Sequence, residues 1–142
     1  KRKTSARNAF FGKIDQVRVG DVQAVIDIVS VDGQRIHSLV TRESQRRLKL
    51  THGCLVAVEV KAPQVVLYKG IEEPECSAEN RFRGAVRRVV KGRINSEVVV
   101  RISERTDLCA VITEQSRAAL QLKAGDPVWA VFNASVAVIH LD

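Results

Sequence analysis

The sequence is poor in aromatic residues, with one Trp, one Tyr and four Phe among 142 residues. Proteins that bind single-stranded nucleic acid stack bases on exposed aromatic rings, so this scarcity argues against that class. The three cysteines form no CxxC pair and are odd in number, which favours a reducing compartment over a disulfide framework. No signal peptide is evident, and no apolar run approaches the ~18 residues of a membrane span. We therefore predict a cytoplasmic protein without a membrane partner.

The sequence also lacks the patterns of catalysis and metal binding. His37, His52 and His140 are scattered without metal-ligand spacing, and no Ser/His/Asp set or carboxylate pair recurs. We predict that the protein is not an enzyme and holds no metal ion. Methionine is absent and the chain opens on Lys1-Arg2-Lys3, which predicts a piece of a longer protein. The net charge of +7 favours anionic partners, whether small oxyanions, nucleic acid or anionic lipid.

The sequence contains an internal repeat, in which the two copies align at an offset of 72 residues and without a gap. About 15 identities in roughly 67 aligned positions are too many and too evenly spread for chance. The clearest match sets Ser5-Ala6-Arg7-Asn8 against Ser77-Ala78-Glu79-Asn80. We predict two domains, residues 1–70 and 71–142, joined by the acidic segment 70–75. Units this small bury little core, so we also expect packing against each other or against a second chain.

The repeat is most informative where it fails. Three basic residues of the first copy face uncharged or acidic residues in the second: Arg7 faces Glu79, Arg47 faces Ala119, and Lys61 faces Asn133. The second copy thus keeps the scaffold and drops the cationic chemistry. Any anion site is expected in the first copy, and the second copy is expected to be degenerate for binding.

The coarse pattern of each copy is β-β-β-α-β-β. Asp32-Gly33 is a strong hairpin signal, Thr41 is a good helix N-cap, and Gly53 is expected to end the short helix and its tail. Five strands with one helix between the third and fourth predict a small barrel, so the fold class is mainly all-β, with tandem OB-like five-stranded barrels. The strands expected in the first copy are Gly12–Val17, Val22–Val31, Arg35–Val40, Leu55–Val60 and Val65–Tyr68. Trp129 lies in an apolar strand and is expected in the core.

Five side chains of the first copy form a candidate anion site. Ser5 and Arg7 are two apart in an extended segment, and Ser44 and Arg47 are three apart on a helix, so each pair shares one side. Lys61 ends a strand before a proline turn, where backbone N–H groups are free to point at a ligand. Two hydroxyls and three fixed positive charges, with no carboxylate, suit a fully ionised tetrahedral dianion, which has only acceptors to satisfy. Phosphate often keeps a proton near pH 7 and is disfavoured.

These residues resemble a known family. Ser5-Ala6-Arg7-Asn8, Thr41 through Ser44, Leu48-x-Leu50-x-x-Gly53 and Lys61-Ala62-Pro63 are similar to the molbindin-type (Mop, or TOBE) oxyanion-binding domain. Storage molbindins with two repeats generally keep the first signature in both copies. The degenerate second copy therefore resembles the C-terminal effector domain of ModE-type molybdate-responsive transcription regulators, which carry a DNA-binding domain upstream.

The resemblance implies a homodimer that binds molybdate or tungstate where two chains meet. The implied contacts are Ser5, Arg7, Lys61 and the backbone at Ala62, with Ser44 and Arg47 from the partner helix. Gln64 departs from the family, which often has Trp at this position. Two alternatives remain open. One is a molbindin that stores or buffers molybdate, and the other is a basic OB-like module that binds nucleic acid.

Overall fold

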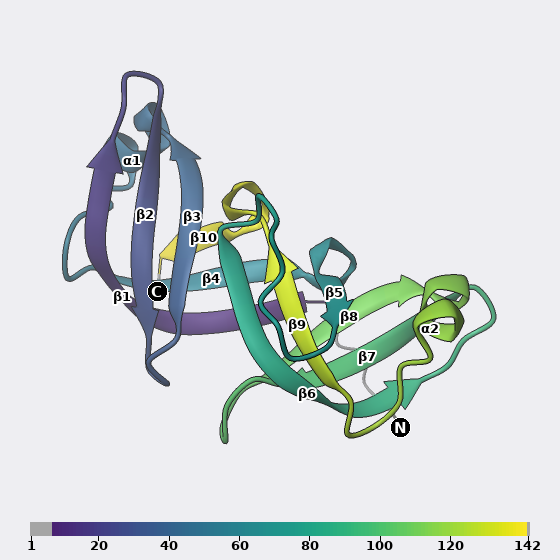
Figure 1. The fold of residues 1–142 in the computed structure, drawn as a ribbon. Helices are drawn as coiled ribbons and strands as arrows, with labels where there is room; N and C mark the ends of the chain where they lie inside the picture. The colour runs from purple at the N-terminus through teal and green to yellow at the C-terminus, as the bar shows by residue number, and fades with distance from the viewer. Residues whose placement is uncertain (1–6, 142) are drawn as a thin grey trace. The chain divides into compact units, whose positions relative to one another are not determined.

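The computed structural model describes residues 7–141, which contain ten β-strands, two short α-helices and two single-turn 3-10 helices (Figure 1). The strands are β1 (Arg7–Val19), β2 (Gln23–Ser30), β3 (Arg35–Thr41), β4 (Leu55–Lys61), β5 (Val66–Lys69), β6 (Asn80–Val90), β7 (Asn95–Arg101), β8 (Asp107–Thr113), β9 (Pro127–Phe132) and β10 (Val138–Leu141). The helices are α1 (Arg42–Arg47), α2 (Glu114–Leu120), η1 (Ala62–Gln64) and η2 (Ala134–Val136).

The strands form two five-stranded sheets, in the orders β10-β4-β1-β2-β3 and β5-β9-β6-β7-β8. The pairs β1–β2, β2–β3, β4–β10, β5–β9, β6–β9, β6–β7 and β7–β8 are antiparallel. One short α-helix follows the third strand of each repeat, α1 after β3 and α2 after β8. The predicted fold class, mainly all-β with two repeated five-stranded elements, is confirmed. Within residues 7–141, no helix is long and apolar enough to cross a membrane.

Each sheet takes its outermost strand from the other repeat. Strand β10 of the second repeat pairs with β4, while β5 of the first repeat pairs with β9. The chain accordingly divides into two compact units. The first-repeat unit comprises residues 9–60 and 133–141, and the second-repeat unit comprises residues 7–8 and 61–132. The boundary near residue 70 stays a prediction about sequence repeats, because the compact units cross it.

Local sequence signals account for most turns and ends. Gly33 has φ of 84° in the β2–β3 hairpin, as the Asp-Gly pair predicts. The Thr41 side chain accepts a hydrogen bond from the Ser44 backbone N–H, which confirms the predicted N-cap. The expected helix end at Gly53 is wrong. Helix α1 ends at Arg47 and Lys49 adopts the left-handed conformation, so the chain leaves the helix before it reaches the glycine.

The central strands β1 and β6 bend at matching points. Each has a register shift, between Ile14 and Gln16 and between Val86 and Arg88, so both copies keep the same β-bulge. A glycine precedes each bulge because the neighbouring strand passes very close. A Cβ at Gly12 would lie 2.2 Å from a backbone carbonyl oxygen on β2, and one at Gly84 would lie 2.4 Å from the equivalent oxygen on β7.

The expectation that Trp129 lies in the core is wrong. Its side chain is half-buried, and the indole N–H donates to the backbone carbonyl of Ile71 at 3.0 Å. In register, Trp129 lies between Tyr68 on β5 and Arg83 on β6, away from the barrel interior. The indole needs a hydrogen-bond acceptor, and the segment after β5 supplies one at the sheet surface.

The strand exchange predicts which unit responds to a change in each outermost strand. Leu67 on β5 and Ile139 on β10 occupy equivalent, nearly buried positions. Truncating such a side chain to alanine costs about 2–5 kcal/mol in a packed core. Ile139→Ala should therefore speed amide hydrogen exchange in β4, whereas Leu67→Ala should speed it in β9. The opposite pattern would mean that each final strand pairs within its own repeat.

Candidate functional site

Arg7 is held in place by its neighbour Asn8. Arg7 opens β1 with an exposed side chain, and Asn8 is 8% exposed. The Asn8 side-chain amide donates to the Cys109 carbonyl at 2.9 Å and accepts from the Cys109 N–H at 2.7 Å. Two reciprocal bonds to the backbone fix both ends of a planar amide, so the start of β1 is anchored on β8.

The Lys61-Ala62-Pro63 segment also contacts β8. Lys61 is the N-cap of η1, and Pro63 lies in the first turn, where its missing N–H costs no hydrogen bond. Ala62 is fully buried against Val99 and Cys109, with Val111 beside them. The Lys61 side chain is exposed, and its ammonium has no hydrogen bond or ion pair with any described residue. Its charge is therefore available to a ligand.

The structure thus gathers part of the predicted set around Cys109. Arg7 is adjacent to a residue bonded to Cys109, and Lys61 is adjacent to a residue packed on it, all in the second-repeat unit. Ser44 and Arg47 lie on α1 in the first-repeat unit. The Ser44 hydroxyl accepts a bond from Thr41, and Arg47 is exposed. Ser5 lies outside the described residues. The complete ligand set stays a prediction.

The thiol beneath this site is neutral. Burial raises the pKa of the Cys109 thiol to about 11, with a further rise from Glu97 and a partial reduction from Arg88. The thiol is therefore protonated at neutral pH. Cys109 is 4% exposed, so this thiol lies in the core. The buried surface under Ala62 is therefore a neutral thiol packed among apolar side chains.

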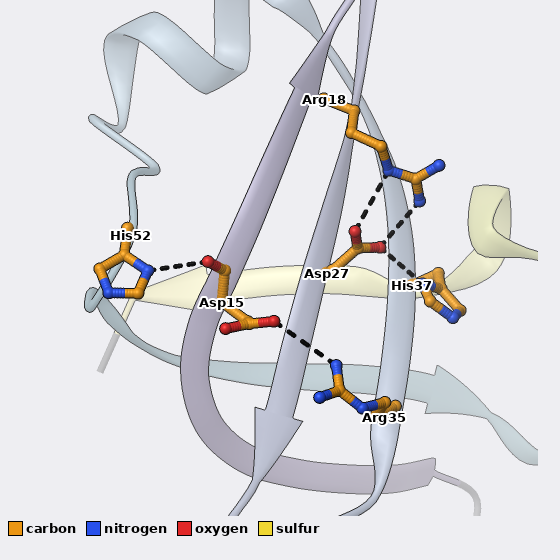
Figure 2. A network of polar contacts seen from close by, with 6 residues as sticks. All are labelled: Asp15, Arg18, Asp27, Arg35, His37 and His52. Atoms are coloured by element: carbon orange, nitrogen blue, oxygen red, sulfur yellow. Dashed lines mark hydrogen bonds and ion pairs between the residues drawn. The ribbon is translucent and has the colours of Figure 1, made fainter.

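The equivalent positions in the first-repeat unit hold polar, hydrogen-bonded residues instead. His37 occupies the place of Cys109, Asp27 that of Val99 and Arg18 that of Val90. Asp27 accepts two hydrogen bonds from the Arg18 guanidinium, at 2.9 and 3.2 Å (Figure 2). His37 Nδ1 lies 2.6 Å from Asp27 Oδ1 and donates to it, because an ionised carboxylate can only accept. Here η2, the counterpart of η1, packs on the strand that carries His37.

Asp27 stays ionised inside this network. Burial raises the pKa of its carboxyl, but the hydrogen bonds and charges of Arg18 and His37 together outweigh burial, so the pKa lies below the ordinary value. The two units therefore place different charges beneath matching 3-10 helices. One helix rests on a neutral thiol, and the other rests on a strand whose histidine is bonded to a carboxylate.

Sequence reasoning did not identify the Arg18–Asp27–His37 network or the anchoring role of Asn8. For Asn8 a signal existed, because it recurs as Asn80, but the motif alone does not say which partner it binds. For the network, the offset comparison shows that all three polar residues become apolar or thiol-bearing in the second copy. His37, which lacks metal-ligand spacing in the sequence, has a structural place in this network. Among residues 7–141 no cluster of three or more metal-ligating side chains occurs.

Comparison with known proteins identifies the family. The TOBE domain matches this chain twice, at residues 4–67 and 76–138. The chain belongs to the TOBE domain family. The double match agrees with the 72-residue offset, and the predicted resemblance is confirmed at the level of the family.

Several TOBE relatives cover nearly all of the chain. The molybdenum-pterin-binding protein MopA of Rhodobacter capsulatus is 31% identical over 139 residues, which is 98% of this chain and 52% of MopA. The DNA-binding transcriptional dual regulator ModE of Escherichia coli K12 is 34% identical over 140 residues, covering 96% of this chain and 51% of ModE. The chain therefore spans about half the length of these relatives.

A solved structure matches the TOBE pair over its whole length. The cytoplasmic molybdate-binding protein ModG, in a crystal form with molybdate bound, superimposes with a TM-score of 0.90 at 34% sequence identity. The match covers 99% of this chain and 100% of the ModG chain. The tandem fold described above is thus also that of a protein with a bound oxyanion.

The Asp27 network predicts a pH-dependent contribution to stability. A carboxyl with a lowered pKa stabilises the fold above its unfolded-state value, near 3.8, and loses that contribution as pH falls through the folded-state pKa. Asp27→Asn should reduce the free energy of unfolding by about 1.5–3 kcal/mol at pH 7, the range for hydrogen bonds to charged groups. The difference from the unaltered protein should shrink below about pH 4. Urea unfolding at several pH values measures both effects.

Asp15→Asn is the matched control. Asp15 is exposed and its contact with Arg35 is long, at 3.5 Å (Figure 2). Such a pair contributes well under about 1 kcal/mol. Equal losses from Asp15→Asn and Asp27→Asn would show that the buried network is not a distinct source of stability.

Proposed function

We propose that this chain is the oxyanion-sensing part of a transcription regulator. It binds one molybdate or tungstate dianion per chain at a homodimer interface. Ser5, Arg7, Lys61 and the Ala62 backbone of one chain contact the anion, and Ser44 and Arg47 of the partner complete the site. The protein binds its ligand without chemical conversion, and its working compartment is the cytoplasm.

The observation that carries this proposal is the convergence of Arg7 and Lys61-Ala62 on one strand, around the neutral Cys109 thiol. Asn8 and Ala62 both contact Cys109, so two cationic residues far apart in sequence are anchored to the same point. The relatives add the ligand class, because MopA is named for molybdenum-pterin binding and ModG carries bound molybdate. The ModE relatives that are named transcriptional regulators support the regulatory class.

The predicted donor set explains the choice of oxyanion. Guanidinium, ammonium, hydroxyl and amide groups all donate, and the set includes no carboxylate to accept a proton from the ligand. Molybdate and tungstate are fully ionised near neutral pH and satisfy this set with four acceptor oxygens. Monohydrogen phosphate would present a hydroxyl without an acceptor, which costs binding free energy.

The second repeat supports a sensor with one site per chain. Glu79 and Asn133 replace Arg7 and Lys61, so the equivalent site lacks both positive charges. In the first-repeat unit η2 also packs on the strand whose His37 is bonded to the Asp27 carboxylate. A storage protein would gain from keeping both sites. The regulator proposal further includes an upstream DNA-binding domain, since the ModE relatives are about twice as long as this chain.

Storage or buffering of the same oxyanion is the second candidate. It is favoured by ModG, a molybdate-binding protein whose full chain is matched by this one. The stoichiometry separates the two functions. Isothermal titration giving one anion per chain supports the sensor, and two or more anions per chain support storage.

The ligand set predicts unequal effects of matched substitutions in the two copies. Arg7→Ala and Lys61→Ala should each weaken molybdate binding by at least tenfold, because a lost bond to a charged group costs about 1.5–3 kcal/mol. Asn133→Ala, at the position equivalent to Lys61, should leave affinity unchanged. Isothermal titration with molybdate, sulfate and phosphate measures affinity and selectivity together. Loss of binding in Asn133→Ala alone would assign the site to the other copy.

A shared site also predicts that the anion stabilises a dimer that exists without it. Binding should add about 2.7 kcal/mol of stability at a hundredfold excess over Kd. Amides of residues 5–8 and 61–64 should gain protection from hydrogen exchange with molybdate, while those of residues 77–80 should not. Sedimentation at micromolar concentration measures the oligomeric state, and hydrogen-exchange mass spectrometry measures the amide protection. A purely monomeric protein, or equal protection in both copies, would contradict the inter-chain site.

A further inference from the structure

A second cationic feature lies on the outer face of the second-repeat unit, on residues that the anion site does not use. We call it the arginine patch. It consists of Arg83, Arg87, Arg101 and Arg105. Arg83 and Arg87 lie on β6 on either side of Ala85, and Arg101 on β7 pairs directly with Ala85. Arg105 follows in the β7–β8 turn. All four side chains are on exposed residues, and the small Ala85 leaves room between them.

The patch is specific to the second copy. The equivalent residues of the first copy are Phe11, Asp15, Val29 and Gly33, none of which is basic. In the first-repeat unit this place is instead an apolar groove of about 340 Å³, lined by Phe11, Val29, Val31 and Leu55 among others. Over the wider segment, residues 80–105 contain eight Arg or Lys against two Glu, whereas residues 8–33 contain two against four Asp. On this face the second copy is therefore basic, whereas the first copy is apolar and acidic.

Asp107 holds two of the arginines in fixed positions. Its carboxylate accepts from Arg87 at 2.6 Å and from Arg101 at 3.2 Å. Two guanidiniums sharing one carboxylate keep a net positive charge and most of their N–H donors. The guanidinium groups of Arg83 and Arg105 have no hydrogen bond or ion pair with any described residue. Glu104 is the nearby acidic residue in the turn, so the patch remains net positive.

The shape and composition of the patch fit a phosphodiester backbone. Arginine forks bind phosphate oxygens with paired, charge-assisted hydrogen bonds, and a sheet presents them on a rigid surface. None of the exposed large hydrophobic residues lies on the patch strands near Ala85, which disfavours a lipid surface. Base stacking is poorly supported, because the neighbouring Trp129 is tied to Ile71 and only Tyr68 remains beside it. A surface that recognises phosphate charge alone should prefer a nucleic-acid duplex, because a duplex carries one negative charge per ~1.7 Å of its axis.

We propose that the arginine patch of the second repeat docks onto the phosphate backbone of double-stranded DNA, without reading its sequence. The degenerate repeat, having no predicted anion site of its own, thereby acquires a separate polyanion-binding role. This surface uses neither Arg7 nor Lys61, so it acts whether or not the oxyanion site is occupied.

Fluorescence anisotropy of the full chain with a short labelled DNA duplex tests the proposal. Three or four phosphate contacts predict that affinity falls about 40-fold to 150-fold between about 50 and 200 mM salt. The combined variant Arg83→Gln, Arg101→Gln, Arg105→Gln should bind at least tenfold more weakly at the lower salt. It should also reduce the magnitude of the slope of log affinity against log salt concentration by about 2 to 3, since each lost phosphate contact removes about 0.9 from the slope. The corresponding three Arg→Lys changes should keep most of the slope.

The matched control removes the same net charge from the first-repeat unit, by Lys13→Gln, Arg35→Gln and Lys49→Gln. It should leave the salt slope unchanged. Molybdate titration of the patch variant should match the unaltered chain, which separates this surface from the proposed sensor site and shows that the fold is intact. Equal weakening by the two triple variants overturns the proposal. So does tighter binding of a single-stranded oligonucleotide or of anionic vesicles than of the duplex, and so does no duplex binding at about 50 mM salt.

Discussion

The exchange of final strands is the constraint on which the rest of this structure depends. Strand β10 completes the sheet of the first repeat, and β5 completes that of the second. The unpaired N–H and C=O groups of β4 and β9 are satisfied only when the other repeat is folded. Neither sequence repeat can therefore complete its sheet alone. The exchange also carries the residues before β5, including Lys61 and Ala62, into the unit built mainly from the second repeat.

This crossing places residues of one copy on strands of the other. Arg7 and Lys61 come from the first repeat, but the strands that their neighbours Asn8 and Ala62 contact, with Val99 and Cys109, come from the second. The second copy therefore remains necessary for positioning these residues, although Glu79 and Asn133 stand in place of Arg7 and Lys61 in its own sequence. Changes of charge at those positions leave this support intact.

Divergence between the copies is mainly electrostatic. Beneath η1 the floor is a protonated thiol, and the strand beneath η2 carries a histidine bonded to an ionised aspartate that an arginine also holds. On the outer face, an apolar groove in one unit corresponds to arginines in the other. The backbone is preserved through these changes because the hydrophobic alternation, the bulges and the close-approach glycines are the same in both copies. Surface and half-buried positions can change charge without disturbing that pattern.

Local patterns in the sequence were sufficient for the repeat, the mainly β fold class, the Asp32-Gly33 hairpin and the Thr41 cap, since each depends on neighbouring residues or a fixed offset. The alignment of the two copies also singled out Arg7 and Lys61, whose role as ligand contacts stays a prediction. Local patterns failed for the helix end near Arg47, where a left-handed Lys49 replaced the expected glycine, and for Trp129, whose apolar surroundings concealed an acceptor from a distant segment. The partners of Asn8 and Asp27, and the crossing of β5 and β10, were decided only by tertiary structure. Those contacts join residues up to 101 positions apart, and a short-range pattern carries no information about which distant strand will satisfy a buried polar group.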